Sequence, residues 1–180
     1  DWNKQTLFIH GSAGLIPKSQ ASIDCQASGT TMRFLTALVS LGNGHYVLDG
    51  TARMRQRPIG DLLNALRMLG VEAEAGSAGE CPPVTIRSTG VTSAKACIQS
   101  TTSSQFASGL ALVAPCMPEG LSLELTGTLV STPYLDMTRK IIESFGGKCE
   151  LRNDRQWHIA PTGYVSKNYE IEPDASAASY

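Results

Sequence analysis

The chain repeats itself, and this internal repeat constrains the fold more than any other feature of the sequence. The segment GTTMRFLTALVSL at 29–41 is matched, about 74 residues later, by SSQFASGLALVAP at 103–115. The segments YVLDGTARMRQRPIGDLLNALRMLG (46–70) and LSLELTGTLVSTPYLDMTRKIIESFGG (121–147) match at nearly the same offset, as do VTIRSTG and WHIAPTG. The period is longer than that of common solenoid repeats. The chain therefore contains a duplicated unit.

Each copy of the repeat predicts the element order βαβαββ. In the first copy we expect strands at 21–25, 46–48, 71–75 and 84–87, with helices at 31–41 and from Pro58 to Gly70. In the second copy we expect strands at 95–99, 121–125, 148–151 and 157–160, with helices after 101–104 and after Pro133. The stretch TLFIH at 6–10 predicts one more strand, the tail of a preceding unit. The fold class is therefore α/β (α+β), built from repeated βαβαββ units.

The helices of the repeat differ in their apolar patterns. The first helix of each copy is apolar almost all round, which is typical of helices buried inside a fold. The second helix of the first copy carries one apolar stripe, formed by Leu62, Ala65, Leu66 and Leu69. We therefore expect the first helices to lie in the interior and the second to cover a core with one face.

The composition is that of a globular protein without a strong overall charge. Its 180 residues are 42% hydrophobic and carry a formal net charge of −1, so no general attraction to nucleic acid or to a membrane is predicted. No apolar run has the length of a membrane span, and the N-terminus lacks a signal-peptide pattern. The five cysteines and three histidines show no metal-ligand spacing. We expect reduced thiols and structural histidines in a cytoplasmic protein.

Small polar residues stand at the start of both apolar helices, in Ser28–Gly29–Thr30 and in Ser103–Ser104–Gln105. Free N–H groups and the positive end of the helix dipole make such a place a potential anion site. Gly29 would let backbone N–H groups approach a ligand closely. Helix capping alone also explains Ser and Thr at these positions, so this pattern leaves both interpretations open.

A basic turn, with Arg53, Arg55 and Arg57, precedes Pro58 in the first copy. Arginine binds carboxylate and phosphate through two parallel hydrogen bonds, although a solvated basic turn is the simpler interpretation. The matching turn of the second copy is uncharged and offers Ser131 and Tyr134 instead. Turns that have diverged in this way suggest two sides of one pocket for an anion.

Several motifs together resemble one enzyme family. They are SGTTMRFLTAL, the run RMRQRPIGDL, SSQF followed by SGL, LVSTPYLDMT, and IEPDASAASY. In this order, over essentially the whole chain, they resemble the 3-phosphoshikimate 1-carboxyvinyltransferase (EPSP synthase) family. The resemblance implies the enolpyruvyl transferase fold, an inside-out α/β barrel, with buried helices aimed at an interdomain cleft.

The resemblance also implies a domain organisation. Residues 1–25 would hold the end of a first unit and the strand that opens the next, 26–90 a second unit, 91–165 a third, and 166–180 the crossover towards a second domain. Because Asp1 is no start residue and the chain stops after a predicted helix cap, we expect an excerpt of a longer protein. The remainder of the same enzyme would then be a partner, carrying about half of the pocket.

The family transfers the carboxyvinyl group of phosphoenolpyruvate to the 5-hydroxyl of shikimate 3-phosphate, in aromatic amino acid biosynthesis, and needs no metal or organic cofactor. The resemblance implies substrate-binding residues rather than catalytic ones in this chain. Ser103, Ser104 and Ser131 would bind the phosphate of shikimate 3-phosphate, Gln105 would bridge both substrates, and Tyr134 would line the shikimate pocket. Arg57 would clamp phosphoenolpyruvate against the backbone of Gly29, with Thr30 and Arg33 supporting the loop.

Two positions depart from the family pattern. Ala27 stands where many members have Asn, and Phe34 where some have Pro. Gly29 keeps the site for the family's inhibitor glyphosate unhindered, so we expect a sensitive enzyme unless Phe34 shifts the helix. A UDP-N-acetylglucosamine enolpyruvyl transferase is an alternative, although SSQ and RPI favour the shikimate enzyme. A non-catalytic domain that binds shikimate 3-phosphate is a further alternative.

Overall fold

The computed structural model describes residues 6–77, 79–99, 103–127, 132–153 and 155–172, and it contains the predicted element order twice. The first unit runs through β1 (Gln20–Asp24), α1 (Gly29–Val39), β2 (Asn43–Asp49), α2 (Gly60–Met68), β3 (Glu72–Ala75) and β4 (Val84–Thr89). The second runs through β5 (Lys95–Gln99), α3 (Ser104–Val113), β6 (Leu121–Thr126), α4 (Thr132–Ser144), β7 (Cys149–Arg152) and β8 (Gln156–Ile159). Short 3-10 helices, η2 (Met54–Gln56) and η3 (Ala114–Cys116), complete the described elements.

The two sheets have the same topology. Strand order is β1-β2-β4-β3 in one and β5-β6-β8-β7 in the other. In each sheet the first pair is parallel, β1 with β2 and β5 with β6, and the remaining pairs are antiparallel. A parallel pair requires a crossover, which α1 and α3 supply. The duplication read from the sequence is therefore confirmed by strand pairing.

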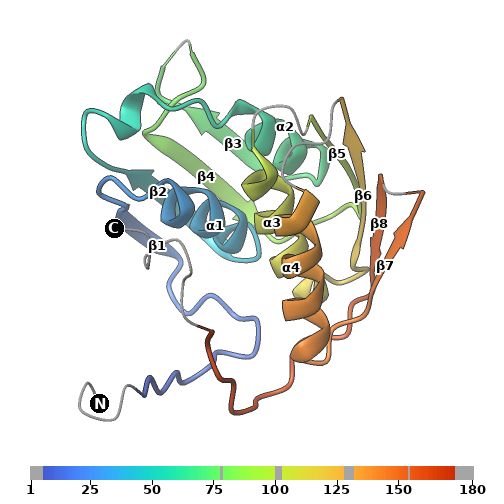
Figure 1. The fold of residues 1–180 in the computed structure, drawn as a ribbon. Helices are drawn as coiled ribbons and strands as arrows, with labels where there is room; N and C mark the ends of the chain where they lie inside the picture. The colour runs from blue at the N-terminus through green and yellow to red at the C-terminus, as the bar shows by residue number, and fades with distance from the viewer. Residues whose placement is uncertain (1–5, 78, 100–102, 128–131, 154, 173–180) are drawn as a thin grey trace, which may run out of the picture.

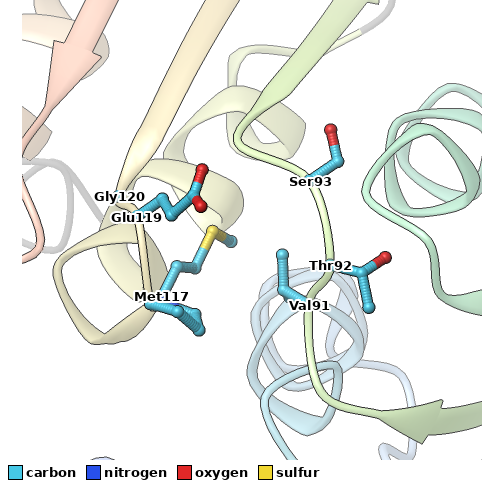
Figure 2. Close-up of a pocket in the computed structure, with 7 residues that line it drawn as sticks. Val91, Thr92, Ser93, Met117, Glu119 and Gly120 are labelled. Carbon is cyan, nitrogen blue, oxygen red and sulfur yellow. The ribbon is translucent and has the colours of Figure 1, made fainter.

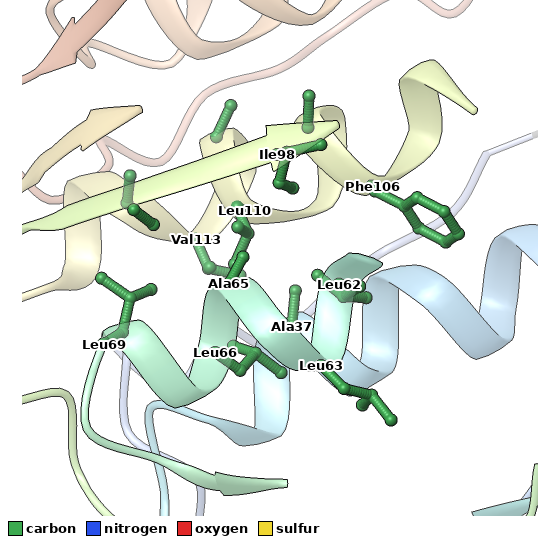
Figure 3. Packing of buried hydrophobic residues seen from close by; sticks show 14 of the residues in the cluster. Ala37, Leu62, Leu63, Ala65, Leu66, Leu69, Ile98, Phe106, Leu110 and Val113 are labelled. Carbon is green, nitrogen blue, oxygen red and sulfur yellow. The ribbon is translucent and has the colours of Figure 1, made fainter. Parts of the chain in front are cut away.

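The helices lie between the two sheets, and both units share one hydrophobic core (Figure 1). Helix α2 of the first unit contacts β5 and α3 of the second. Figure 3 shows its Leu62 and Ala65 facing Ile98 of β5 and Leu110 of α3. All four residues of the predicted stripe are completely buried, and each buried leucine contributes about 1.5–3 kcal/mol to stability. The stripe of α2 thus joins the units.

Helices α1 and α3 pack closely because small residues meet between them. A methyl group built on Gly109 would lie 3.5 Å from Cβ of Ala37 and 3.4 Å from the carbonyl oxygen of Arg33. One turn earlier on each helix, Arg33 donates a hydrogen bond to Gln105. Since the contacts advance by one turn on both helices together, α1 and α3 run in the same direction. Their N-termini therefore open at the same end of the molecule.

Glycines end α2 and α4 at equivalent positions of the repeat. Gly70 and Gly146 both have φ of +85°, the left-handed conformation that follows many helix C-termini. The amide of Gly70 donates to the carbonyl of Arg67, and that of Gly146 to the carbonyl of Glu143. The expectation that Gly70 stops its helix is confirmed.

Three local predictions differ from the structure. Residues 6–10 form no strand, and Leu7, Phe8 and Ile9 are 76–80% exposed, since no described strand lies beside them to pair with. Pro58 lies two residues before α2 rather than in its first turn, because Ile59 occupies the N-cap position. Helix α1 is buried on only part of its surface, as Leu38 is 38% exposed, whereas α3 is buried on nearly every residue.

The basic turn before α2 is held by an ion pair. Arg55 donates to both carboxylate oxygens of Asp49, from Nε at 3.0 Å and from Nη2 at 2.5 Å. The same carboxylate accepts from the amide of Gly50 at 2.8 Å. The hydrogen bond from Arg55 is the main reason that the pKa of Asp49 lies below its usual range. The pair ties η2 to the end of β2.

We predict opposite effects for two substitutions of Gly109. Gly109→Ala keeps the fold, because its methyl group reaches only ordinary contact distance and alanine favours the helix by about 0.5–1 kcal/mol. Gly109→Leu lowers the free energy of unfolding by about 1–3 kcal/mol, because the side chain must enter the α1–α3 contact. Urea unfolding of both variants measures this. Equal free energies of unfolding for Gly109→Ala and Gly109→Leu would contradict the close packing of α1 against α3.

We predict that Asp49→Asn lowers the melting temperature at neutral pH but not in acid. The depressed pKa of Asp49 means that its contribution is present above the pKa of the unfolded chain and is lost as the pH falls through the folded value. The melting temperatures of the wild type and Asp49→Asn should therefore begin to approach each other as the pH falls below about 4, and should coincide only below the folded pKa of Asp49. Arg55→Met removes the other partner of the ion pair. Because either single change already breaks the pair, the double variant should be no less stable than either single variant.

Candidate functional site

The start of α1 is built around Gly29 and Arg57. Ser28 caps the helix, its side chain accepting from the amide of Thr31 at 3.2 Å. A methyl group built on Gly29 would lie 2.5 Å from Nη1 of Arg57 and 2.8 Å from its Cζ. The guanidinium therefore packs directly on the Gly29 backbone. Only glycine permits this contact without displacing the arginine.

The start of α3 has the same design with hydroxyl groups. Ser103 is the N-cap and accepts from the amide of Gln105 at 3.2 Å. Ser104, the first residue of the helix, is only 7% exposed. A hydroxyl that accepts a hydrogen bond still carries a hydrogen to donate, and the first amides of the helix add further donors. The arrangement suits an anion.

Three side chains join the two helix starts. Arg33 of α1 donates from Nη1 to Oε1 of Gln105, and Nε2 of Gln105 donates to Oγ1 of Thr30 at 3.3 Å. The residues expected from the sequence to flank the anion site, Gly29, Arg57, Ser103, Ser104 and Gln105, therefore gather at one end of α1 and α3. Thr30 and Arg33, which we expected only to support the loop, lie among them.

Helix α4 begins beside this end. Its Thr138, nearly two turns into α4, donates to Oγ of Ser108, about one turn into α3, at 2.8 Å, and Figure 1 shows α3 and α4 running side by side. Tyr134 lies one turn before Thr138 and is 57% exposed. The side chain of Tyr134 is therefore accessible at the start of α4. Ser131, the remaining predicted residue, lies outside the described residues.

The charge at this end comes from two arginines. Burial lowers the pKa of Arg33, and the nearby charge of Arg57 lowers it further. No ion pair within the described ranges includes either arginine, whereas Arg55 of the same turn is paired with Asp49. Two like charges held together near helix N-termini create a local positive potential in a protein whose net charge is −1.

A hollow of about 190 Å³ lies at the other end of the helices (Figure 2). Residues 91–93 form one wall, and residues 117–120, which follow α3 and η3, form the other. None of these lining residues begins a helix in the part of the chain that the structure describes. The residues that line the hollow include the acidic Glu119 and no cationic side chain, so we do not place the anion site there.

The described residues include no cluster of three or more histidine, cysteine or acidic side chains that could hold a metal. All five cysteines are described, and none forms a disulfide. Burial raises the pKa of the Cys25, Cys116 and Cys149 thiols, in the last case to about 11, which disfavours the reactive thiolate. Within the same residues, no helix is both long and apolar enough to cross a membrane.

Comparison with known proteins identifies relatives along the whole chain. The family model for EPSP synthase (3-phosphoshikimate 1-carboxyvinyltransferase) matches residues 1–180. A Nostoc punctiforme protein named 3-phosphoshikimate 1-carboxyvinyltransferase is 40% identical over 175 residues, which are 97% of this chain and 41% of that protein. A Rhizobium etli protein of the same name is 38% identical over 177 residues, or 97% of this chain and 42% of its own length.

The fold is shared with a solved structure. An EPSP synthase from Acinetobacter baumannii superposes with a TM-score of 0.74 at 22% identity, covering 88% of this chain and 35% of that one. The chain therefore spans well under half the length of the proteins it matches. Sequence match, fold and relatives agree, and the chain belongs to the EPSP synthase (3-phosphoshikimate 1-carboxyvinyltransferase) family.

Proposed function

We propose that the protein containing this chain transfers the carboxyvinyl group of phosphoenolpyruvate to the 5-hydroxyl of shikimate 3-phosphate and releases phosphate. The observation that carries this proposal is the guanidinium of Arg57 on Gly29, beside the start of α3. Both substrates are anions, and helix N-termini with arginine and hydroxyl groups are built to bind them. The names of the relatives favour this reaction over that of the UDP-N-acetylglucosamine enzyme.

We assign binding and positioning roles to the residues at the helix starts. Ser103 and Ser104, with Ser131, bind the phosphate of shikimate 3-phosphate, and Tyr134 lines the shikimate pocket. Held at fixed positions, such donors reduce the entropy lost when two reactants meet and stabilise developing negative charge.

Gln105 stands between the two substrates, and Arg57 clamps phosphoenolpyruvate against Gly29. The reaction proceeds by addition and elimination, so a group must deliver and remove protons. We assign that work to the remainder of the enzyme, because the residues gathered here are hydroxyl, amide and guanidinium groups.

The domain organisation follows from the same proposal. Residues 1–25 end a first unit and open the next, 26–90 and 91–165 are the second and third units, and 166–180 lead towards a second domain. The protein works in the cytoplasm without metal or organic cofactor and takes no nucleic acid or membrane as partner. The five unpaired thiols support a reducing compartment.

We predict that the chain binds shikimate 3-phosphate but does not turn it over. In calorimetry, Ser104→Ala should weaken binding by at least about tenfold, because a charge-assisted hydrogen bond is lost. Ser93→Ala, in the hollow at the opposite end, is the matched control and should change nothing. Phosphate release by the chain alone, supplied with both substrates, should be absent.

The same titration is repeated with the complementary C-terminal part of a relative added to the chain. Heat of binding that is seen only in the mixture would mean that the C-terminal part must first organise the half of the pocket that this chain carries. No heat in either case would overturn the proposed function.

We predict that the complete reading frame carrying this chain is sensitive to glyphosate, and that Gly29→Ala is not. The added methyl group would meet Nη1 of Arg57 at 2.5 Å, so the guanidinium must leave its place. Inhibition constants and the KM for phosphoenolpyruvate should both rise, by about tenfold or more. The melting temperature should hardly fall, because the displaced atoms end a flexible side chain. A wild-type inhibition constant far above that KM would refute the first half.

A further inference from the structure

Arg33 occupies an unusual place for a charged residue. It lies in the middle of the apolar helix α1, is partly buried, and its guanidinium stacks on Phe106 at 5.1 Å from the ring centre. Its Nη1 donates to Oε1 of Gln105. No acidic side chain among the described residues pairs with it. A half-buried cation is therefore satisfied by one amide and one aromatic ring.

The arginine fixes which way the Gln105 amide points. The two ends of a glutamine amide look alike, but arginine can only donate, so the atom facing Arg33 must be the oxygen. The nitrogen then faces Thr30, to whose Oγ1 it donates at 3.3 Å. One hydrogen of the NH₂ group is used in that bond, and the second hydrogen remains available to donate to a ligand. Gln105 thus offers a ligand a donor and not an acceptor.

Keeping Arg33 charged in this position is unfavourable. Burial lowers its pKa, and the charge of Arg57 lowers it further. The matching position of the second unit, Ala107, shows that the repeat can fill this place with an apolar residue. Stability of the helix pair therefore does not require a cation here, and a role in ligand binding explains it better.

We propose that Arg33 is a positioning residue for Gln105. It holds the amide with its NH₂ group towards the helix starts, so that the site selects an acceptor oxygen at this point, such as a carboxylate, ether or phosphate oxygen. The inference rests on the proposed function for the ligand, but its structural half concerns Arg33, Gln105 and Thr30 alone.

The structural half is tested by NMR on the ¹⁵N-labelled chain without ligand. The Gln105 side-chain NH₂ signals are assigned by their loss in Gln105→Met. In the wild type they should show a nuclear Overhauser effect to the methyl group of Thr30. Arg33→Met should abolish this effect, Arg33→Lys should restore part of it, and Arg55→Met, the matched loss of a charge, should leave it intact. An unchanged effect in Arg33→Met would overturn the proposal.

The binding half is tested by a double-mutant cycle with shikimate 3-phosphate in calorimetry. Arg33→Met should weaken binding by about tenfold in the wild type. In the Gln105→Met background, the factor by which Arg33→Met weakens binding should be at least threefold smaller, because only the loss of charge remains. Equal losses in both backgrounds would overturn the positioning role. If Arg33→Met does not fold, Arg33→Lys enters the same cycle, with a smaller expected difference.

The two proposals fail in different ways. Absence of shikimate 3-phosphate binding by the wild type, both alone and with the complementary C-terminal part added, would refute the proposed function and leave the NMR result standing. Wild-type binding with no coupling between Arg33 and Gln105 would refute the positioning role and leave the function standing.

Discussion

The contact between α1 and α3 is the constraint on which the rest of the structure depends. These helices are the same element of two repeated units, and they approach closely because Gly109 and Ala37 leave room between them. Since they run in the same direction, their dipoles point the same way. Parallel dipoles repel each other, so the arrangement must be held by packing, and it leaves two positive helix ends together. Packing thus determines where an anion can bind.

Charge at this end is local rather than global. Arg33 and Arg57 lie near each other in a chain whose overall charge is close to zero, and the pKa of Arg33 is lowered by its surroundings. An anionic ligand would remove the repulsion between the two guanidinium groups. The free energy of the proposed binding would therefore include the relief of an unfavourable state of the empty site, which is common where function and stability compete.

The repeat made most of the fold predictable, because each ambiguous segment could be compared with its copy. The strand at 95–99 is weakly patterned alone, whereas its neighbour at 121–125 alternates strictly between leucine and polar residues, and both appear in the sheet. The stretch at 6–10 has an equally good pattern and forms no strand, because a strand also needs a neighbour, which its own residues do not encode. For the site, the pattern of the turn alone could not say which arginine of 53–57 faces the helices, since that depends on the turn geometry, and only the family resemblance pointed to Arg57. The role that we propose for Arg33 had one visible signal in the sequence, a charge inside an apolar helix where the other copy has an alanine.

The packing of α2 against β5 has a consequence for the dynamics of the chain. A helix from one copy completes the interior of the other, so neither copy can open without exposing the leucines of α2 to water. Amide protons of β5 and α2 should accordingly exchange with solvent through a shared opening event, despite their separation in sequence. Duplication has produced a single cooperative body, in which the starts of α1 and α3 share the rigidity of the whole interior.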